Sequence, residues 1–222
     1  MRVTPAVPAA APSGPVAHVV LAGHIAGAGT AGGTRLVVGR WRRSPLGSFA
    51  DVMVEHPDGT RVLLAPRDDV ADLILRLYTF DAVHVVDVRV LADAASRTWT
   101  VVAGPLQARL TIGRRTPVGT VLGLVPPGLV GARATAGAVD AVARTLVPGV
   151  RTRGRGADGS WEVYGARDQH AVTAIDATWG DRDLGELRSV EPAVRFGFSS
   201  VPAQPTVTSV RVTIGPPAAR HP

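Results

Sequence analysis

An aspartate on an otherwise apolar strand face is the first feature of the sequence that could do chemistry. The stretch Trp41–Pro66 alternates about a His-Pro-Asp-Gly-Thr turn, which predicts a β-hairpin. In the register set by that turn, Asp51 lies between Phe49 and Met53. A carboxyl group there resists ionisation unless a cation or hydrogen-bond donors compensate it, so it could serve as a general acid or base. We therefore predict Asp51 as the catalytic candidate; the alternative is that it caps the chain corner through backbone bonds.

The rest of this hairpin is predicted to have a structural role. Its opposite face carries only apolar side chains, which predicts that this face packs in the core: Val52, Val54, Val62 and Leu64. Next to the turn the register pairs Glu55 with Arg61. Because this pair lies at the end of the hairpin, we predict that it is a solvated cross-strand ion pair.

Histidines supply a second group of candidates. His170 and Asp168 lie two residues apart in a predicted strand, and regular alternation would place them on the face of Glu162, Tyr164 and Val172. This pattern predicts a polar pocket with His170 as a ligand-binding residue. A separate histidine, at position 84, shares a face with valines and is interpreted as a core residue. A metal site would need a third ligand that the spacing does not supply, so no metal and no cofactor are expected.

Residue types that are missing exclude several chemistries. The chain has no Cys, and all of its 24 basic residues are Arg. Disulfides, thiolate nucleophiles, Cys-ligated metals and lysine Schiff bases are therefore excluded. No Gly-x-Ser-x-Gly motif is present, and Ser199-Ser200 has no recognisable base beside it, so a triad hydrolase is not favoured.

Charge and hydropathy restrict the partners. The formal net charge of +6 comes with short Arg clusters and only 5% aromatic residues, so nucleic acid is not expected as a partner. The longest uncharged apolar stretch, 116–132, is interrupted by Pro126-Pro127, and the N-terminus is rich in proline where a signal peptide would be continuously apolar. We expect no membrane partner and a cytoplasmic location, and self-association is left open.

The periodicity predicts an α+β protein. Strands are expected at 16–27, 34–41, 82–91, 97–103, 106–112, 161–179 and 205–214, in addition to the hairpin. An amphipathic helix is expected over 68–78, with Asp68 as its cap and an Asp72/Arg76 pair, and a second helix over about 127–147. The expected architecture is a curved or barrel-like antiparallel sheet with two packed helices. One domain, 16–215, would lie between a Pro/Ala-rich disordered tail, 1–15, and a short tail, 216–222.

The corner before Asp51 carries a family resemblance. The run Ser44-Pro45-Leu46-Gly47-Ser48-Phe49-Ala50-Asp51 resembles the Ser-Pro-x-Gly-Pro-Tyr-x-Glu stretch of acetoacetate decarboxylase-like proteins. The resemblance implies a cone-like antiparallel sheet around a pocket, with Asp51 in place of the family's active-site Glu. Where that family has its Schiff-base lysine, this chain reads 77–81, Leu-Tyr-Thr-Phe-Asp. The resemblance therefore implies a pocket without imine chemistry.

These observations predict a domain that binds a small molecule, such as a keto acid or a polyketide-like ligand. An Arg would hold a carboxylate or enolate-like oxygen, and Asp51 would move a proton if there is chemistry. Two alternatives remain, a lysine-independent lyase or isomerase that uses Asp51 as acid and base, and a structural or partner-binding protein. The expected ligand-binding residues are Arg40, Ser44, Met53, Tyr78 and His170.

Overall fold

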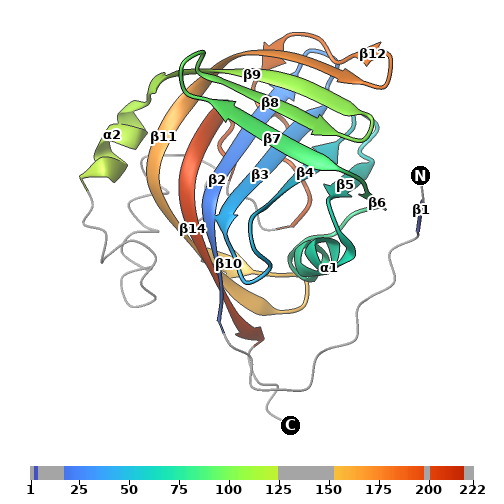
Figure 1. Cartoon of the computed structure of the whole chain (residues 1–222), viewed down its shortest axis with the longest axis vertical. Helices are drawn as coiled ribbons and strands as arrows, with labels where there is room; N and C mark the ends of the chain where they lie inside the picture. Colours follow the sequence, from blue (N-terminus) through green and yellow to red (C-terminus); the bar gives the residue numbers. More distant parts are fainter. Residues whose placement is uncertain (1–2, 5–17, 125–152, 198–200, 218–222) are drawn as a thin grey trace.

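One long, curled β-sheet organises the chain (Figure 1). The structure is a computed structural model and describes residues 3–4, 18–124, 153–197 and 201–217. Across the sheet the strands follow in the order β1 (Val3–Thr4), β6 (Ala82–Val85), β5 (Arg61–Ala65), β4 (Phe49–Glu55), β3 (Arg35–Arg43), β2 (Val19–Thr30), β14 (Thr206–Pro217), β11 (Ser160–Trp179), β9 (Leu106–Arg115), β8 (Thr98–Ala103) and β7 (Val88–Asp93). Short strands β10 (Arg153–Arg155) and β12 (Arg182–Asp183) pair with β11, and β13 (Leu187–Arg188) pairs with β2.

The central strands are covered on both faces. Helix α1 (Asp68–Leu77) packs on one face together with apolar residues of β14 and of the segment 190–196; we call this the α1 side. Strands β7, β8 and β9 lie across the ends of the long strands (Figure 1) and cover the other face, which we call the β8 side. Neighbouring strands are antiparallel except β5 and β6, which are parallel. The predicted α+β architecture with a curved, largely antiparallel sheet is confirmed.

The β4–β5 hairpin has the predicted register. Val54 lies opposite Val62 and Met53 opposite Leu63, and the turn closes with a 2.9 Å bond from the His56 backbone N–H to the Thr60 carbonyl oxygen. Gly59 takes a positive φ of 89°, which glycine adopts without steric cost. The alternation therefore sends one set of side chains to the α1 side and the other to the β8 side.

Helix α1 forms where the period of 3.6 predicts it, and its apolar stripe is buried on the sheet: Val70, Ala71, Leu73, Ile74 and Leu77. Two details of the prediction are wrong. The cap position is Arg67, which makes no side-chain capping bond, and Asp68 lies in the first turn instead. Arg76 pairs with Asp158 of the β10–β11 turn, where its Nε lies 3.1 Å from Asp158 Oδ2.

Other predicted elements differ in detail. The expected strand 82–91 is divided into β6, which pairs with β5, and β7, which pairs with β8. A second helix, α2 (Pro117–Gly123), was not predicted; the Thr116 hydroxyl caps it by accepting a bond from the Gly119 N–H. The expected helix 127–147 lies outside the described residues, as do most of the two expected tails. Among the described residues, no helix is long and apolar enough to cross a bilayer.

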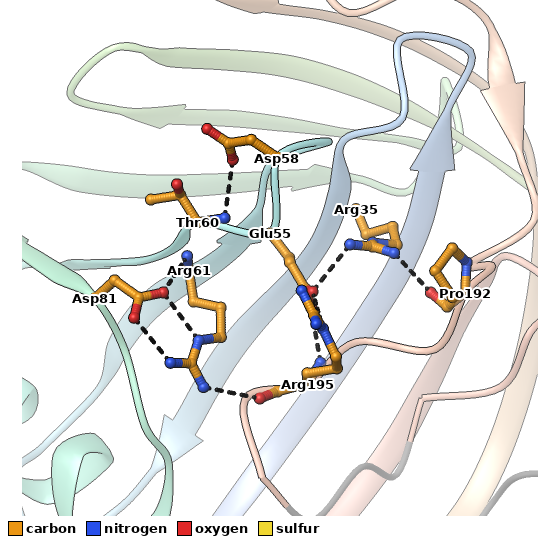
Figure 2. A network of polar contacts seen from close by, with 8 residues as sticks. All are labelled: Arg35, Glu55, Asp58, Thr60, Arg61, Asp81, Pro192 and Arg195. Carbon is orange, nitrogen blue, oxygen red and sulfur yellow. Dashed lines mark hydrogen bonds and ion pairs between the residues drawn. The ribbon is translucent and has the colours of Figure 1, made fainter.

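The predicted solvated pair of Glu55 and Arg61 is wrong. Glu55 is fully buried and binds two other cations, the Arg35 guanidinium at 3.0 Å and the Arg195 Nε at 2.7 Å (Figure 2). The Arg195 backbone N–H also donates to Glu55, at 2.7 Å. Arg61 instead makes a bidentate pair with Asp81. The reason is tertiary: the segment 190–196 covers this end of the hairpin and brings its own cation.

Removal of the Glu55 carboxylate should destabilise the fold strongly. In Glu55→Ala the buried Arg35 loses its carboxylate, and removal of one partner of a buried ion pair costs about 3–5 kcal/mol. Urea unfolding at pH 7 should show this loss. Glu186→Ala, which removes an exposed carboxylate that pairs with Arg188, should change the free energy of unfolding by less than about 1 kcal/mol. Equal effects of the two substitutions would contradict the assigned role of Glu55.

Candidate functional site

A small cavity lies under α1, on the side of the sheet where Asp51 points. The volume open to the centres of water molecules is about 20 Å³, room for roughly one water. Apolar side chains dominate its lining, and the polar groups come from a few residues on β3, β4, the C-cap of α1 and β11. The lining residues are Leu21, Ile25, Val37, Gly39, Trp41, Asp51, Met53, Ile74, Leu77, Tyr78, Tyr164 and Val212.

Asp51 is fully buried and has one hydrogen-bond donor. The Trp41 indole Nε1–H donates to Asp51 Oδ1 at 2.8 Å, while Oδ2 is buried without a partner in the described structure. Burial raises the pKa of Asp51 to about 6, against the smaller opposing effect of the Trp41 bond. Because Oδ1 already accepts a bond, the proton of the neutral form belongs on Oδ2.

The bond between Trp41 and Asp51 depends on a glycine. Residue 39 lies directly opposite Asp51 in the β3–β4 ladder, and a Cβ on it would lie 2.4 Å from Asp51 Oδ1 and 2.6 Å from Trp41 Nε1. No side chain fits there without displacing this pair. Gly39 therefore leaves the space in which the indole reaches the carboxyl group.

A second buried acid is linked to the cavity by two tyrosines. Tyr164 donates its hydroxyl proton to Glu162 Oε2 at 2.8 Å, and its oxygen then accepts a very short bond from the Tyr78 hydroxyl. Within the described ranges Glu162 Oε1 is buried without a partner, and burial raises the pKa of Glu162 to about 7. Burial also raises the pKa of Tyr78, with contributions from the negative charges of Glu162 and Asp51. The two tyrosines therefore stay protonated and form a directed chain from the cavity to Glu162.

Three of the six residues expected from the sequence meet in this cavity. Asp51 and Met53 reach it from β4, where residues two apart share a face, and Tyr78 reaches it from the C-cap of α1. Tyr164 also lines the cavity, although the alternation predicts it only as a neighbour on the face of His170 and Asp168. The sequence pattern did not lead to a prediction of Trp41 as a site residue. Its position two residues beyond Gly39 on β3, beside the Ser-Pro corner, is the signal that could have indicated it.

The other three expected residues lie elsewhere. Ser44 is at the exposed corner, where its hydroxyl donates to the Gly47 carbonyl oxygen at 2.6 Å. Arg40 neighbours Gly39 on β3, so its side chain points to the β8 side, away from Asp51. His170 also belongs to the β8 side.

A β-bulge explains the position of His170. The ladder between β11 and β14 shifts register between Ala166 and Asp168, so one extra residue reverses the alternation. The expectation that His170 and Asp168 share a face with Glu162 and Tyr164 is therefore wrong: Tyr164 belongs to the core of the α1 side, and Val172, on the face of His170, belongs to the core of the β8 side. Within the part of the chain that the structure describes, no group of three or more His, Cys, Asp or Glu residues could hold a metal ion.

Comparison with known proteins identifies no family for this chain. No family model and no curated protein matches the chain. One crystal structure from Nitrosomonas europaea, a protein provisionally named AttH, aligns with 99% of this chain at 12% identity and a TM-score of 0.26. The chain spans 60% of the length of that structure. So weak a likeness carries no argument about fold or function. The fold and the site therefore give its class: it is an α+β protein whose curled sheet encloses a small apolar cavity with a buried acid.

The buried Asp51 should make the protein less stable as the pH rises. Because the pKa of Asp51 is about 6 in the folded state and 3.8 in the unfolded chain, its contribution is fully present below pH 4 and is lost between pH 4 and 6. At about 1.4 kcal/mol per pKa unit, this loss is roughly 3 kcal/mol. Asp51→Asn cannot ionise, so its stability relative to the wild type should rise by that amount between pH 4 and 7, as measured by urea unfolding.

The matched control is Asp176→Asn, which makes the same change at an exposed position of β11. Its stability relative to the wild type should stay constant over the same pH range. If the difference in stability between Asp51→Asn and the wild type is also constant over this pH range, folding does not raise the pKa of Asp51.

Proposed function

We propose that this protein binds a small, neutral, largely apolar molecule that carries a carbonyl or enol oxygen, in the cavity under α1 and without imine chemistry. The observation that carries the proposal is the buried Asp51 Oδ2, which has no partner among the residues that the structure describes and belongs to a residue lining a mostly apolar cavity. An apolar pocket with one or two fixed polar groups is the usual form of a small-molecule site. In its neutral form Asp51 would donate a hydrogen bond to the ligand oxygen.

The absence of a cation among the described lining residues favours a neutral ligand over a keto acid. A carboxylate in this cavity would be buried without a counterion, near two acids, Asp51 and Glu162. A polyketide-like diketone has the same carbonyl groups without that cost. The resemblance of the Ser-Pro corner to acetoacetate decarboxylase-like proteins supports a ligand of the carbonyl class, and the Arg expected to hold a carboxylate is on the other side of the sheet.

Ligand entry requires local movement, because the cavity has room for about one water. Met53 is the most adaptable side chain in the lining, since its unbranched thioether repacks readily. Tyr78 follows the last turn of α1 and is buried against the same space. Displacement of these two side chains would enlarge the cavity along the apolar seam between α1 and β4.

Binding of 2,4-pentanedione, compared with acetoacetate, tests this proposal. The two probes differ by a methyl group in place of a carboxylate oxygen. Pentanedione should bind, detected by a shift of the Trp41 indole N–H resonance, and its affinity should fall as the pH rises through about 6, because Asp51 then loses its donor proton. Acetoacetate should bind at least tenfold more weakly. Asp51→Asn keeps a donor at this position, so it should bind pentanedione with no pH dependence.

Asp51→Leu has no hydrogen-bond donor at this position, so it should not bind pentanedione. The indole N–H resonance that is missing from the spectrum of Trp41→Phe is the one that belongs to Trp41. Stronger binding of acetoacetate than of pentanedione would contradict the assignment of a neutral ligand. Equal, pH-independent binding by the wild type and by Asp51→Leu would remove Asp51 from the site.

An enzymatic role is the second candidate, supported by two carboxyl groups with raised pKa values, about 6 for Asp51 and about 7 for Glu162. Such groups can exchange protons near neutral pH, which suits a lyase or isomerase that forms an enol. If Asp51 is an acid and base, the wild type should accelerate deuterium exchange at the α-carbon of 2-butanone, followed by NMR in D₂O. Asp51→Asn should abolish the acceleration while still binding, and Asp176→Asn should retain it. No acceleration by the wild type would leave binding as the function.

A further inference from the structure

A row of polar side chains crosses the sheet on the β8 side, opposite the cavity. The strand ladders place Arg40 of β3 beside His24 of β2, His24 beside Ser209 of β14, and Ser209 beside Asp168 of β11. Residues directly opposite each other in antiparallel strands point to the same face. Because neighbouring strands are about 4.8 Å apart, the four positions form a continuous line across the sheet.

The row borders the core of the β8 side. The His24 ring makes an edge contact with the buried Trp99 of β8, with ring centroids 6.0 Å apart. His170 lies next to the row, because the β11 bulge turns it to the same face. Arg40, His24 and Ser209 are each partly buried, so they are reachable from solvent but not freely mobile.

The charges of this row do not balance. Asp168 is already neutralised by Arg115, whose Nε is 2.8 Å away, and lies 3.4 Å from His170 Nε2. Arg40 and its neighbour on the same face, Arg42, make no ion pair with any described carboxylate. His24 Nδ1 is buried and has no hydrogen-bond partner among the described residues. In the part of the chain that the structure describes, the row therefore leaves two guanidinium groups without a carboxylate and an imidazole nitrogen without a partner.

We propose that this row is an anion-binding site, in which Arg40 and Arg42 pair with a phosphate-type or carboxylate group that also contacts His24 and Ser209. Guanidinium groups bind these planar or tetrahedral oxyanions through paired N–H donors, and the Ser hydroxyl supplies a further donor. The Arg115–Asp168 pair marks the end of the site on β11. This site is on the opposite face from Asp51, so it is independent of the function proposed above.

The charges around His24 predict how an anion affects it. Burial lowers the pKa of His24, and the positive charges of Arg40 and Arg42 lower it further. The charge of Asp168, which is paired with Arg115, raises the pKa of His24, and His170 lowers it. A bound anion would offset the two guanidinium groups and favour protonated His24, so the affinity for acetate, whose charge is constant over this range, should increase as the pH falls from 8 to 6.

Titration with inorganic phosphate tests the site. Ionic strength is held constant with sodium chloride, and the imidazole resonances of the uniformly ¹⁵N-labelled full chain are followed. Phosphate should shift the His24 resonance saturably, whereas chloride alone should not, and Arg40→Gln should weaken binding at least tenfold. Arg89→Gln, which removes an exposed guanidinium paired with Asp87, is the matched control and should leave the affinity unchanged.

Acetate and phosphate titrated separately distinguish the two oxyanion classes, and saturable binding of either supports the site. Arg42→Gln, at an exposed position, provides a second variant if Arg40→Gln unfolds. The proposal is overturned if neither anion shifts His24 beyond the effect of chloride, or if Arg89→Gln weakens binding as much as the row variants do.

Discussion

Burial of β4 on both faces is the constraint on which the rest of the structure depends. All seven residues of this strand are buried, and two of them, Asp51 and Glu55, are acids that point to the same side. A buried charge is tolerated only when it is paired or neutralised. Glu55 is paired with two arginines, whereas Asp51 receives a single neutral donor from Trp41. One strand thus contains both a fully compensated acid and an acid with unused hydrogen-bonding capacity.

The difference between the two acids distinguishes a structural role for Glu55 from a candidate functional role for Asp51. The Glu55 network joins the sheet to the segment 190–196, because Arg195 binds Glu55 through its backbone and its side chain and Arg35 also donates to the Pro192 carbonyl oxygen (Figure 2). All of these interactions close off this end of the α1 side. At the other end, the apolar cavity, Asp51 and the tyrosine chain to Glu162 leave buried oxygens that a ligand could satisfy. Polar groups of that kind are costly for stability, which is why they are more informative about function than the paired ones.

The curled sheet also keeps two polar sites apart. Alternation along β3 sends Trp41 to the α1 side and Arg40 to the β8 side, although the two residues are adjacent. The cavity is therefore lined by one acid and two tyrosines, while the row on the β8 side has Arg40 and Arg42 beside an Asp168 that is already paired with Arg115. A neutral carbonyl ligand suits the first environment and an anion suits the second. The same physical rule, that each buried or half-buried polar group needs a partner, is the reason why a different ligand is proposed for each side.

The sequence by itself determined the hairpin register, the position of α1, the curved α+β sheet and the exclusion of thiol and lysine chemistry, because these follow from local periodicity, turn residues and composition. Only the tertiary structure decided that Arg195 is a partner of Glu55, since Arg195 is 140 positions away along the chain and local pattern carries no information about it. The same holds for the bulge in β11, which moved His170 to the other face without a signal in the alternation. Asp51 was predicted as a buried acid from its neighbours, but its indole donor, the glycine that makes room for it and the cavity beside it depend on how distant strands and a helix pack together.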